Sequence, residues 1–347
     1  MDLSQVYSLQ LELTSYCNAR CPHCPRYDGY GNLHPQLQLG KWDWLAVKPN
    51  FQIPHLHNLK EILLQGDKGD PVMHPNITEI LEDFCSTNVL VELNTNGGIR
   101  SKDWWSNIAK LSNLRVAFSI DGLEDTSPIY RQKVNYQNVI ENAKSFIKNN
   151  GYAIWQCLIF KHNEHQMGQI RNYAIELGFK EVRFASCDVH RFHGQSFWNI
   201  IEDGKIIDKI EPPTTSELEI KSNEYIDDAR VRFRRLQNQS HFCPNLKNGH
   251  LYINCHGDVV PCCMMHYEYE FRNHPYANPD TIKLVDNFIG DRRLNNLHYS
   301  KLSDILTNKF FTKNLNESFA QNKFLSVCES SCGTEIRKNL DKLQFDT

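Results

Sequence analysis

Three cysteines lie within eight residues near the N-terminus, at Cys17, Cys21 and Cys24. A structural zinc site takes four ligands in a tetrahedron, so three thiolates would need a fourth ligand from elsewhere. Three thiolates can instead hold a cubane iron–sulfur cluster and leave one of its irons open to a small molecule. The sequence favours the open cluster, and a zinc half-site completed by His23 or a later cysteine is the alternative.

Length and composition indicate a globular protein of about two domains. The chain has 347 residues, 40% of them hydrophobic, and a domain typically takes about 150 residues. The formal charge of −3 comes from mixed acidic and basic residues, which speaks against a nucleic-acid partner. No apolar run reaches the ~18 residues of a membrane helix, and the N-terminus lacks the order of a signal peptide. We therefore expect a cytoplasmic protein with no membrane partner, whose 12 cysteines are metal ligands, redox groups and core residues rather than disulfides.

Short β-type runs alternate with amphipathic helical patterns between residues 8 and 187. The expected strands lie near 8–14, 60–65, 90–94, 114–119, 152–160 and 181–186. The expected helices lie near 76–87, 102–111, 135–149 and 164–177. This alternation predicts an α/β fold with a parallel sheet. Six units are too few for the usual eight-unit barrel, so we expect a partial (β/α)6 TIM-type barrel, with the three cysteines in the loop after its first strand.

The cysteine spacing reads Cys-x3-Cys-x-aromatic-Cys, with His23 as the ring before the last cysteine. In this feature the sequence resembles the radical S-adenosylmethionine (radical SAM) superfamily. Three later segments are similar to further motifs of that family, namely Gly69-Asp70-Pro71, Asn94-Thr95-Asn96-Gly97, and Ser119-Ile120-Asp121-Gly122 with Arg131 after it. Each fragment is a weak signal alone, but the motifs follow the expected strands in the family's order, which makes the resemblance specific.

The resemblance implies that SAM is bound by His23, Gly69, Asp70, Asn94, Ser119, Asp121, Arg131 and Ile159. Asp70 stands where the family usually has a glutamate that holds the methionine amino group, so its carboxylate has a shorter reach. Arg131 would pair with the methionine carboxylate, for which its planar fork is suited. Ser119 and Asp121 would lie near the ribose, and Ile159 would form a wall of the adenine pocket.

The same resemblance implies the chemistry. Cys17, Cys21 and Cys24 would bind a [4Fe-4S] cluster whose open iron chelates the amino and carboxylate groups of SAM. In this family the reduced cluster passes one electron to SAM, and the resulting 5′-deoxyadenosyl radical abstracts hydrogen from an unactivated C–H bond. The protein contributes positioning and the exclusion of competing hydrogen donors. An external one-electron reductant of flavodoxin or ferredoxin type is an implied partner.

A second cysteine-rich region runs from Cys243 through Gly257 to Cys262. Its spacing resembles the opening motif of the SPASM and twitch auxiliary-cluster domains that follow radical SAM barrels. Two short strands, HLYIN and DVVPC, would form a hairpin with a thiolate at either end. The expected division of the chain is a barrel in 1–190, a linker with one exposed helix in 191–240, and a twitch-like domain of β-hairpin plus helix in 241–347.

A full SPASM domain would hold two auxiliary clusters, but this chain lacks some of its cysteines. Phe319 and Asn322 stand at the positions of one missing pair. The resemblance therefore implies one auxiliary [4Fe-4S] cluster, bound by Cys243, Cys262, Cys328 and Cys332. A structural zinc ribbon on the same four thiolates is the alternative, because ligand count alone does not separate zinc from iron–sulfur.

Cys263 is left over beside the second hairpin thiolate. It could return a hydrogen atom to a substrate radical, which would make it catalytic. The alternative is a buried thiol or a substitute ligand, since free cysteines are commonly buried. Cys187 is a weaker candidate for the same role, Cys85 and Cys157 are expected in the core, and Cys255 could be either.

Three functions are compatible with these residues. The first is a radical SAM oxidoreductase or modifying enzyme that acts on a residue of a peptide. The second is a dehydrogenase or epimerase of a small hydroxylated molecule such as an aminosugar or cyclitol. The third is a non-enzymatic, zinc-stabilised binding module. Only seven residues precede the first expected strand, which is too few for an N-terminal peptide-recognition domain. This favours a small molecule or a short peptide that is held directly, and a separate peptide-recognition protein could take the place of that domain.

Overall fold

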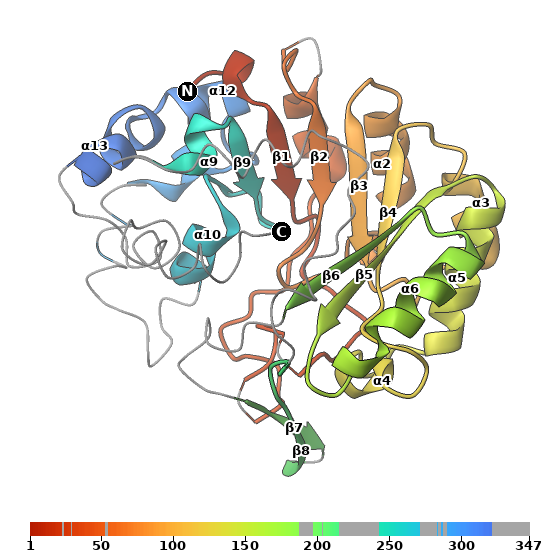
Figure 1. Cartoon of the computed structure of the whole chain (residues 1–347). Coiled ribbons are helices and arrows are strands. Elements are labelled where there is room, and N and C mark those ends of the chain that lie inside the picture. The colour runs from red at the N-terminus through yellow and green to blue at the C-terminus, as the bar shows by residue number, and fades with distance from the viewer. Residues whose placement is uncertain are drawn as a thin grey trace. The chain divides into compact units, whose positions relative to one another are not determined.

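The computed structural model describes residues 1–22, 24–28, 30–52, 55–186, 197–202, 204–214, 243–270, 283, 286 and 290–320 (Figure 1). The chain forms two compact units. The first unit contains the described residues of Met1–Ser15, Gln36–Asp67 and Ile226–Phe345, and the second contains those of Tyr16–Pro35 and Lys68–Tyr225. The boundaries expected near residues 190 and 240 fall outside the described residues, so the division into three parts stays a prediction.

Four parallel strands form the sheet of the second unit, in the order β3-β4-β5-β6. They are β3 (Leu90–Thr95), β4 (Leu114–Ser119), β5 (Tyr152–Ile159) and β6 (Glu181–Ser186). The α-helices are α2 (Ile77–Cys85), α3 (Lys102–Ile108), α4 (Ser127–Tyr130), α5 (Tyr136–Lys148) and α6 (Met167–Leu177). Helices α3, α5 and α6 each connect one strand to the next, as parallel pairing requires. The expected α/β alternation is confirmed, with element ends shifted by a few residues.

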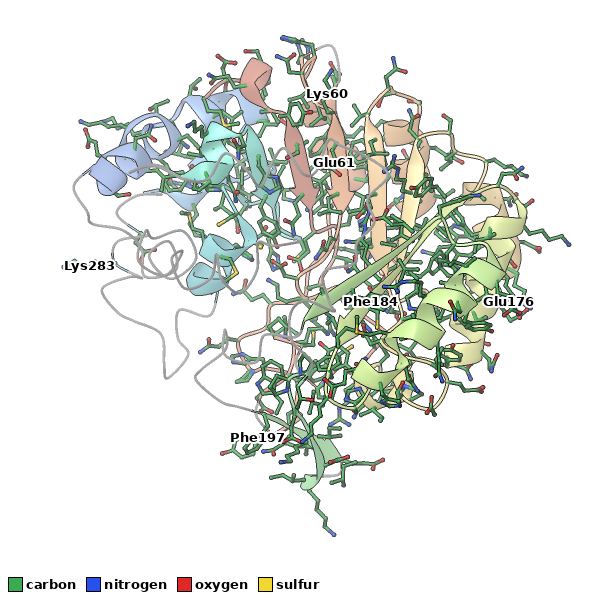
Figure 2. The ribbon with its side chains drawn as sticks, viewed as in Figure 1. Lys60, Glu61, Glu176, Phe184, Phe197 and Lys283 are labelled. Atoms are coloured by element: carbon green, nitrogen blue, oxygen red, sulfur yellow. The ribbon has the colours of Figure 1, made fainter. Side chains whose placement is uncertain are left out.

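Helix α5 shows why these segments are helical. Asn135 caps its start by accepting a hydrogen bond from the N–H three residues later (2.9 Å), the usual role of an asparagine before a helix. Val139, Ala143 and Phe146 recur every three to four positions and are buried, as a helix face packed on a sheet requires. By contrast Glu176 on α6 is exposed and points away from the sheet (Figure 2). The fully buried aromatic side chains of this core include Trp105, Phe118, Phe146 and Trp155.

A buried ion pair shows that the sheet of the second unit curls. Glu92 lies on β3 and Arg183 lies on β6, with β4 and β5 between them. Three strand spacings amount to about 14 Å in a flat sheet. Arg183 nevertheless donates from Nη1 and Nη2 to the two Glu92 carboxylate oxygens, at 2.7 and 3.0 Å, and neither residue is more than 9% exposed. The strands therefore curve around these side chains, as a partial barrel does.

The first unit has its own strands, in the order β10-β9-β1-β2. Strand β1 (Ser8–Leu11) runs parallel to both β2 (Glu61–Leu64) and β9 (His250–Ile253), and β10 (Val259–Val260) is antiparallel to β9. The β9–β10 pair is the expected C-terminal hairpin. The α-helices of this unit are α1 (Trp44–Val47), α9 (Pro244–Lys247), α10 (Cys263–Glu270), α12 (Leu302–Thr307) and α13 (Leu315–Ala320). Across the described part of both units, no helix combines the length and apolarity needed to cross a membrane.

Residues 197–214 differ from the expected linker. They contain an antiparallel hairpin of β7 (Trp198–Glu202) and β8 (Lys205–Ile210). Gly204 in its turn has a φ of +73°, a conformation that glycine adopts without strain. The signal that sequence reasoning missed is an Asp-Gly pair between runs of isoleucine, which favours a hairpin. The exposed helix expected in this region lies outside the described residues.

Removing the Glu92 carboxylate should destabilise the second unit. Arg183 would keep its contact with Glu181 (Nε to Oε1, 2.6 Å) but lose its bidentate partner, so we expect Glu92→Leu to cost about 3 kcal/mol, the lower end for a broken buried pair. The measurement is the urea midpoint by circular dichroism. Glu141→Leu, which removes a surface pair with Lys102, is the control and should shift the midpoint little. Equal midpoints for the two variants would contradict the buried pair.

Candidate metal centre and cofactor site

The three N-terminal cysteines lie in a tightly wound loop of the second unit. The Ala19 N–H points at the Cys17 sulfur at 3.4 Å, and the Cys24 N–H donates to the Cys21 carbonyl at 3.0 Å. Ala19 and Cys21 are buried in an apolar cluster, and Cys17 and Cys24 pack against the same cluster. The loop therefore gathers its three thiols on one apolar base.

The thiols lie close enough to affect one another's ionisation. Burial, and then the neighbouring Cys21 and Cys17, raise the pKa of Cys24 to about 12. Burial, and then Asp70, raise the pKa of Cys17 to about 12, with a further contribution from Cys21. Both groups are therefore protonated at neutral pH in the absence of a metal. Metal binding must displace these protons, as it does for any cysteine ligand.

The two metal sites considered for the three thiols need different arrangements of the ligands. Among the residues that the structure describes, no three His, Cys, Asp or Glu side chains converge as ligands of a single ion. A cubane takes each thiolate on a different iron, so its ligands surround a cluster and need not meet at a point. His23, the suggested fourth zinc ligand, lies outside the described residues.

Asp70 holds the turn that follows β3. Its carboxylate accepts hydrogen bonds from the Val72 N–H (3.0 Å), the Thr95 hydroxyl (2.9 Å), the Asn96 N–H (2.8 Å) and the Asn96 side-chain amide (2.6 Å). A carboxylate offers about four acceptor sites, so these donors occupy it. Burial raises the pKa of Asp70, and the hydrogen bonds oppose that effect. Asp70 thus positions this turn, and its direct contact with the SAM amino group stays a prediction.

Asn96 connects the Asp70 carboxylate to the cysteine loop. Besides Asp70, its Nδ2 lies 2.9 Å from Asn18 Oδ1 and 3.7 Å from the Cys17 sulfur. Hydrogen bonds to a thiolate ligand are one of the means by which a protein tunes an iron–sulfur cluster. Sequence reasoning named Asn94 from this segment and missed both Asn96 and Asn18. The Asn-Thr-Asn-Gly turn was the available signal for the first of them.

Arg131 makes a similar connection to Cys21. Its Nη1 lies 3.7 Å from the Cys21 sulfur, and its Nε donates to Asp121 Oδ2 at 2.5 Å. Asp121 is fully buried, and its Oδ1 accepts a hydrogen bond from the Leu158 N–H at 2.7 Å. The ion pair thereby fixes the guanidinium beside the cysteine loop. Two of the three cysteine sulfurs thus have an N–H donor from a motif residue nearby.

The remaining residues predicted to bind SAM lie at or near strand ends. Ser119 and Ile159 are the last residues of β4 and β5, and Asn94 is the last but one of β3. Carboxyl ends of parallel strands meet at one edge of the sheet, where ligands commonly bind. Ile159 is fully buried, whereas Asn94, Ser119 and Gly69 are half-buried. Their contacts with SAM, like that of His23, stay predictions.

Two of the predicted auxiliary ligands flank the β9–β10 hairpin of the first unit. Cys243 immediately precedes α9, and Cys262 follows β10. Asn245 of α9 donates from Nδ2 to the Pro261 carbonyl at 3.1 Å, which joins the segments that carry the two cysteines. Met265 N–H points at the Cys262 sulfur at 3.5 Å. The other two predicted ligands, Cys328 and Cys332, lie outside the described residues.

Cys263, at the start of α10, is half-buried. Burial, and then Asp67 and Cys262, raise its pKa well above the ordinary value, so it is a neutral thiol at physiological pH. Only a neutral thiol carries the hydrogen atom that the catalytic hypothesis needs, and that role stays a prediction. Cys85 and Cys157 are buried in α2 and β5, as expected of core cysteines. The two other leftover cysteines are Cys255, which is fully buried, and Cys187, which lies outside the described residues.

The sequence matches two family models. Residues 11–174 match the model described as the radical SAM superfamily. Residues 243–333 match the SPASM model, described as an iron–sulfur cluster-binding domain. This chain belongs to the radical SAM superfamily. The resemblance carried by the cysteine spacing is thereby confirmed, and the SPASM match spans all four predicted auxiliary ligands.

Known proteins with similar sequences are distant from this radical SAM protein. A "tungsten-containing aldehyde ferredoxin oxidoreductase cofactor-modifying protein" of Pyrococcus furiosus is 22% identical over 320 residues, which cover 88% of this chain and 82% of that protein. A "GTP 3′,8-cyclase" of Microcystis aeruginosa is 31% identical over 98 residues, which cover 27% of this chain and 29% of that protein. At these identities neither substrate transfers to the present protein.

Solved structures share the radical SAM fold with this chain. Streptococcus suis SuiB bound to S-adenosylmethionine matches with a TM-score of 0.57 at 15% identity, over 95% of this chain and 71% of that one. The protein anSMEcpe with bound AdoMet, the same compound, matches with a TM-score of 0.56 at 15% identity, over 94% of this chain and 85% of that one. These likenesses show the fold, and they confirm the predicted fold class.

Family membership implies the cofactors. A radical SAM domain implies a [4Fe-4S] cluster, and a SPASM domain implies an auxiliary iron–sulfur cluster. SAM is the ligand in both solved structures above. The loop with Cys17, Cys21 and Cys24 supplies three thiols packed against one apolar cluster, which is the donor set that the first cluster takes. Together these findings favour a radical SAM enzyme over the zinc-stabilised binding module.

Replacing Cys24 with Ala should remove the SAM-binding cluster. The loop would lose one of three ligands, so iron measured after anaerobic reconstitution should fall from about eight to about four atoms per chain. Reductive cleavage of SAM should stop, while the absorption of the auxiliary cluster persists. Cys85→Ala changes a core cysteine instead and should keep full iron. Wild-type iron content and cleavage in Cys24→Ala would show that the loop is not the cluster site.

Replacing Asp70 with Asn should disturb the turn after β3. An amide has one acceptor oxygen in place of two, so either the Val72 N–H on Oδ1 or the two Asn96 donors on Oδ2 would lose their partner, at a cost of about 1–3 kcal/mol. The urea midpoint should therefore fall. The electron paramagnetic resonance spectrum of the reduced cluster should also change, because Asn96 reaches Cys17. Asp208→Asn on the exposed β8 strand is the control. If Asp70→Asn has the same urea midpoint and the same spectrum as this control, Asp70 does not position the turn.

Proposed function

We propose that the protein is a radical SAM oxidoreductase or modifying enzyme that abstracts hydrogen from an unactivated C–H bond of a peptide residue. The outcome would be oxidation, epimerisation or cross-linking of that residue. The observation that carries the proposal is the loop of Cys17, Cys21 and Cys24, with N–H groups of Asn96 and Arg131 near two of the sulfurs. When bound, the reduced cluster supplies the electron that cleaves SAM into methionine and the 5′-deoxyadenosyl radical.

Arg131 would bind the SAM carboxylate. A guanidinium carries five N–H donors, so the contacts with Asp121 and Cys21 leave donors for a carboxylate. Asp121 would keep the guanidinium oriented and balance its charge. Because Arg131 lies beside the Cys21 sulfur, a carboxylate held there would lie next to the cluster, where the open iron needs it.

Asn96 and Arg131 would also ease reduction of the cluster. Reduction adds negative charge to the cluster and its thiolates, and N–H donors near the sulfurs stabilise that charge. Asp70 would contribute indirectly, by fixing Asn96 through two of its hydrogen bonds. The electron would come from an external donor of flavodoxin or ferredoxin type.

A peptide substrate is supported by two related structures. SuiB has been solved bound to the precursor peptide SuiA, and it matches this chain with a TM-score of 0.55 at 13% identity. The protein anSMEcpe has been solved with AdoMet and the Cp18Cys peptide, with a TM-score of 0.55 at 15% identity. On this analogy we assign a peptide residue as the substrate, bound directly or through a separate peptide-recognition protein.

The C-terminal region would hold one auxiliary [4Fe-4S] cluster on Cys243, Cys262, Cys328 and Cys332. Cys263 would lie beside that cluster because it adjoins Cys262 in the chain. As a neutral thiol it would return a hydrogen atom to the substrate radical when the reaction is an epimerisation. The thiyl radical left on Cys263 would then take one electron from the external donor and a proton from solvent to restore the thiol.

Anaerobic turnover with deuterated substrates tests this function. Peptides and aminosugars deuterated on carbon are incubated with reductant and SAM, and deuterium in 5′-deoxyadenosine is read by mass spectrometry. We expect transfer from a peptide carbon, and none with the Cys24→Ala variant. Transfer from aminosugars alone would contradict the peptide assignment. Intact SAM in iron-replete protein would contradict the enzyme class.

A further inference from the structure

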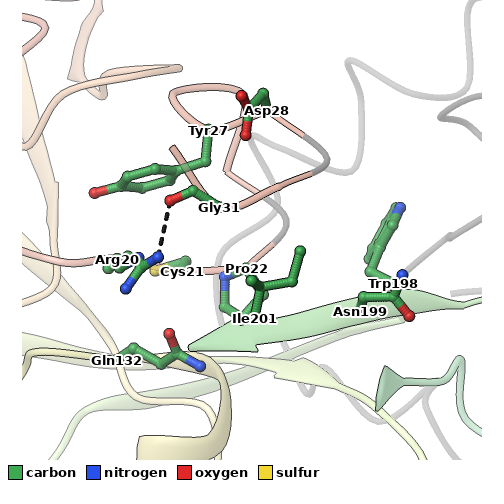
Figure 3. Close-up of a pocket in the computed structure, with 10 residues that line it drawn as sticks. All are labelled: Arg20, Cys21, Pro22, Tyr27, Asp28, Gly31, Gln132, Trp198, Asn199 and Ile201. Carbon is green, nitrogen blue, oxygen red and sulfur yellow. Dashed lines mark hydrogen bonds between the residues drawn. The ribbon is translucent and has the colours of Figure 1, made fainter. Parts of the chain in front are cut away.

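The second unit contains a cavity beside the cysteine loop that the SAM motifs do not use. Its volume is about 130 Å³, several times the ~30 Å³ that a water molecule occupies. Arg20, Tyr27 and Gln132 line one side, and Trp198 and Asn199 of β7 line the other (Figure 3). Among the described residues, none that the motifs assign to SAM contributes to its wall. The cavity is therefore distinct from the described part of the predicted SAM-binding set, although it borders the same loop.

Two charged side chains line this cavity, Arg20 and Asp28. The Asp28 carboxylate accepts hydrogen bonds from the N–H groups of Tyr30 (2.9 Å) and Asn32 (2.8 Å) and forms no ion pair with Arg20. The Arg20 side chain is half-buried, its Nη2 donates to the Gly31 carbonyl at 2.8 Å, and its guanidinium lies 6.0 Å from the centre of the Tyr27 ring. Within the described residues no carboxylate lies at ion-pair distance from it. A guanidinium has five donors, and the described residues supply an acceptor for only one nitrogen. A partly desolvated charge of this kind gains most from an anionic ligand.

Two carboxamides add neutral hydrogen-bonding groups to the same cavity. Gln132 is held next to Arg20, because the Arg20 N–H donates to the Gln132 carbonyl at 2.9 Å. Asn199 lies on the opposite wall. Neither side-chain amide has a hydrogen-bond partner among the described residues. Each offers both a donor and an acceptor, which matches a carboxylate together with the peptide amides beside it.

The wall formed by β7 is fixed by apolar packing. Ile200 of β7 and Ile210 of β8 are buried in the same cluster as Ala19 and Cys21, and Trp198 packs against that cluster. Because strand residues alternate between faces, Asn199 lies on the face opposite to Ile200. The hairpin that the sequence did not predict therefore supplies one side of the cavity, and its buried isoleucines pack against the cysteine loop.

We infer that this cavity binds a carboxylate group of the substrate, with Arg20 as its charge partner and Gln132 and Asn199 as hydrogen-bond partners. The inference rests on the proposed function and narrows it. The substrate is a peptide that carries an acidic side chain or a free C-terminal carboxylate near the residue that reacts. The aromatic rings of Tyr27 and Trp198 cover the aliphatic part of such a side chain. Because Cys21 lines the cavity, the bound carboxylate would lie directly beside the cysteine loop.

Equilibrium binding tests the inference on the full-length, iron-reconstituted protein. The probes are N-acetyl-glutamate methylamide, its glutamine counterpart of the same shape, and succinate, each titrated by calorimetry. We expect the glutamate probe to bind at least tenfold more tightly than the glutamine probe, the size of effect that one charge-assisted hydrogen-bonded pair produces. Succinate should bind more weakly than the glutamate probe. If succinate binds more tightly than the glutamate probe, the carboxylate that the cavity binds does not come from a peptide.

Variants on both walls locate the binding. Arg20→Gln should abolish the preference for the glutamate probe over the glutamine probe. Asn199→Leu should lower the affinity for the glutamate probe about tenfold. Lys205→Gln removes an exposed charge from the same hairpin and should bind as the wild type does. Asn199 lies outside the cysteine loop, so its variant remains informative if Arg20→Gln loses its cluster.

The outcomes separate this inference from the proposed function. If wild-type protein cleaves SAM but shows no preference for the glutamate probe, the cavity assignment is wrong and the enzyme class stands. The same holds if the preference persists in Arg20→Gln protein that has full iron, because Arg20 would then only tie the loop to Gly31. If wild-type protein with full iron does not cleave SAM, the proposed function is wrong whatever the probes do.

Discussion

The buried Asp70 carboxylate is the contact on which the arrangement of the site depends. It accepts four protein hydrogen bonds, two of them from Asn96, and Asn96 in turn reaches the Cys17 sulfur. A cluster with only three protein ligands needs these ligands to be positioned before the small molecule arrives, because the fourth ligand does not belong to the protein. The short aspartate fits this role, since its carboxylate lies against the turn after β3 rather than extending past it. A second buried carboxylate, Asp121, holds Arg131 beside Cys21 in the same way.

The fold explains how these polar side chains can be buried at the site. Parallel strands place the ends of β3, β4 and β5 at one edge of the sheet, so short motifs far apart in the chain meet there. The Glu92 and Arg183 pair shows that polar side chains also occupy the concave side of the curled sheet. Each of these buried charges has a partner, as burial requires. The stability of the second unit and the geometry of its site thus depend on the same kind of contact.

Much of this arrangement was predictable from the sequence, because it depends on motifs that lie within short segments. The cysteine spacing, the βα alternation and the order of the motifs are each readable in short windows. The family matches confirm the family that the spacing and the motifs indicated, and the structure confirms the βα alternation. The roles within a motif were harder to read. The Asn-Thr-Asn-Gly turn contains both Asn94 and Asn96, and the fold shows that Asn96 lies between Asp70 and Cys17. The β7–β8 hairpin was missed because charged residues and prolines nearby outweighed an Asp-Gly turn signal. Because β7 forms one wall of the cavity beside Arg20, the sequence alone did not predict that cavity.

The central claim is that Cys17, Cys21 and Cys24 bind a cluster whose fourth position is open to SAM. Electron–nuclear double resonance on the anaerobically reduced protein tests it most directly, with SAM labelled by ¹⁵N in its amino group and ¹³C in its carboxylate. The account predicts hyperfine coupling of both labels to one cluster in the wild type, and its loss in Cys24→Ala while the auxiliary signal remains. Iron-replete wild-type protein in which neither label couples to any cluster would contradict it.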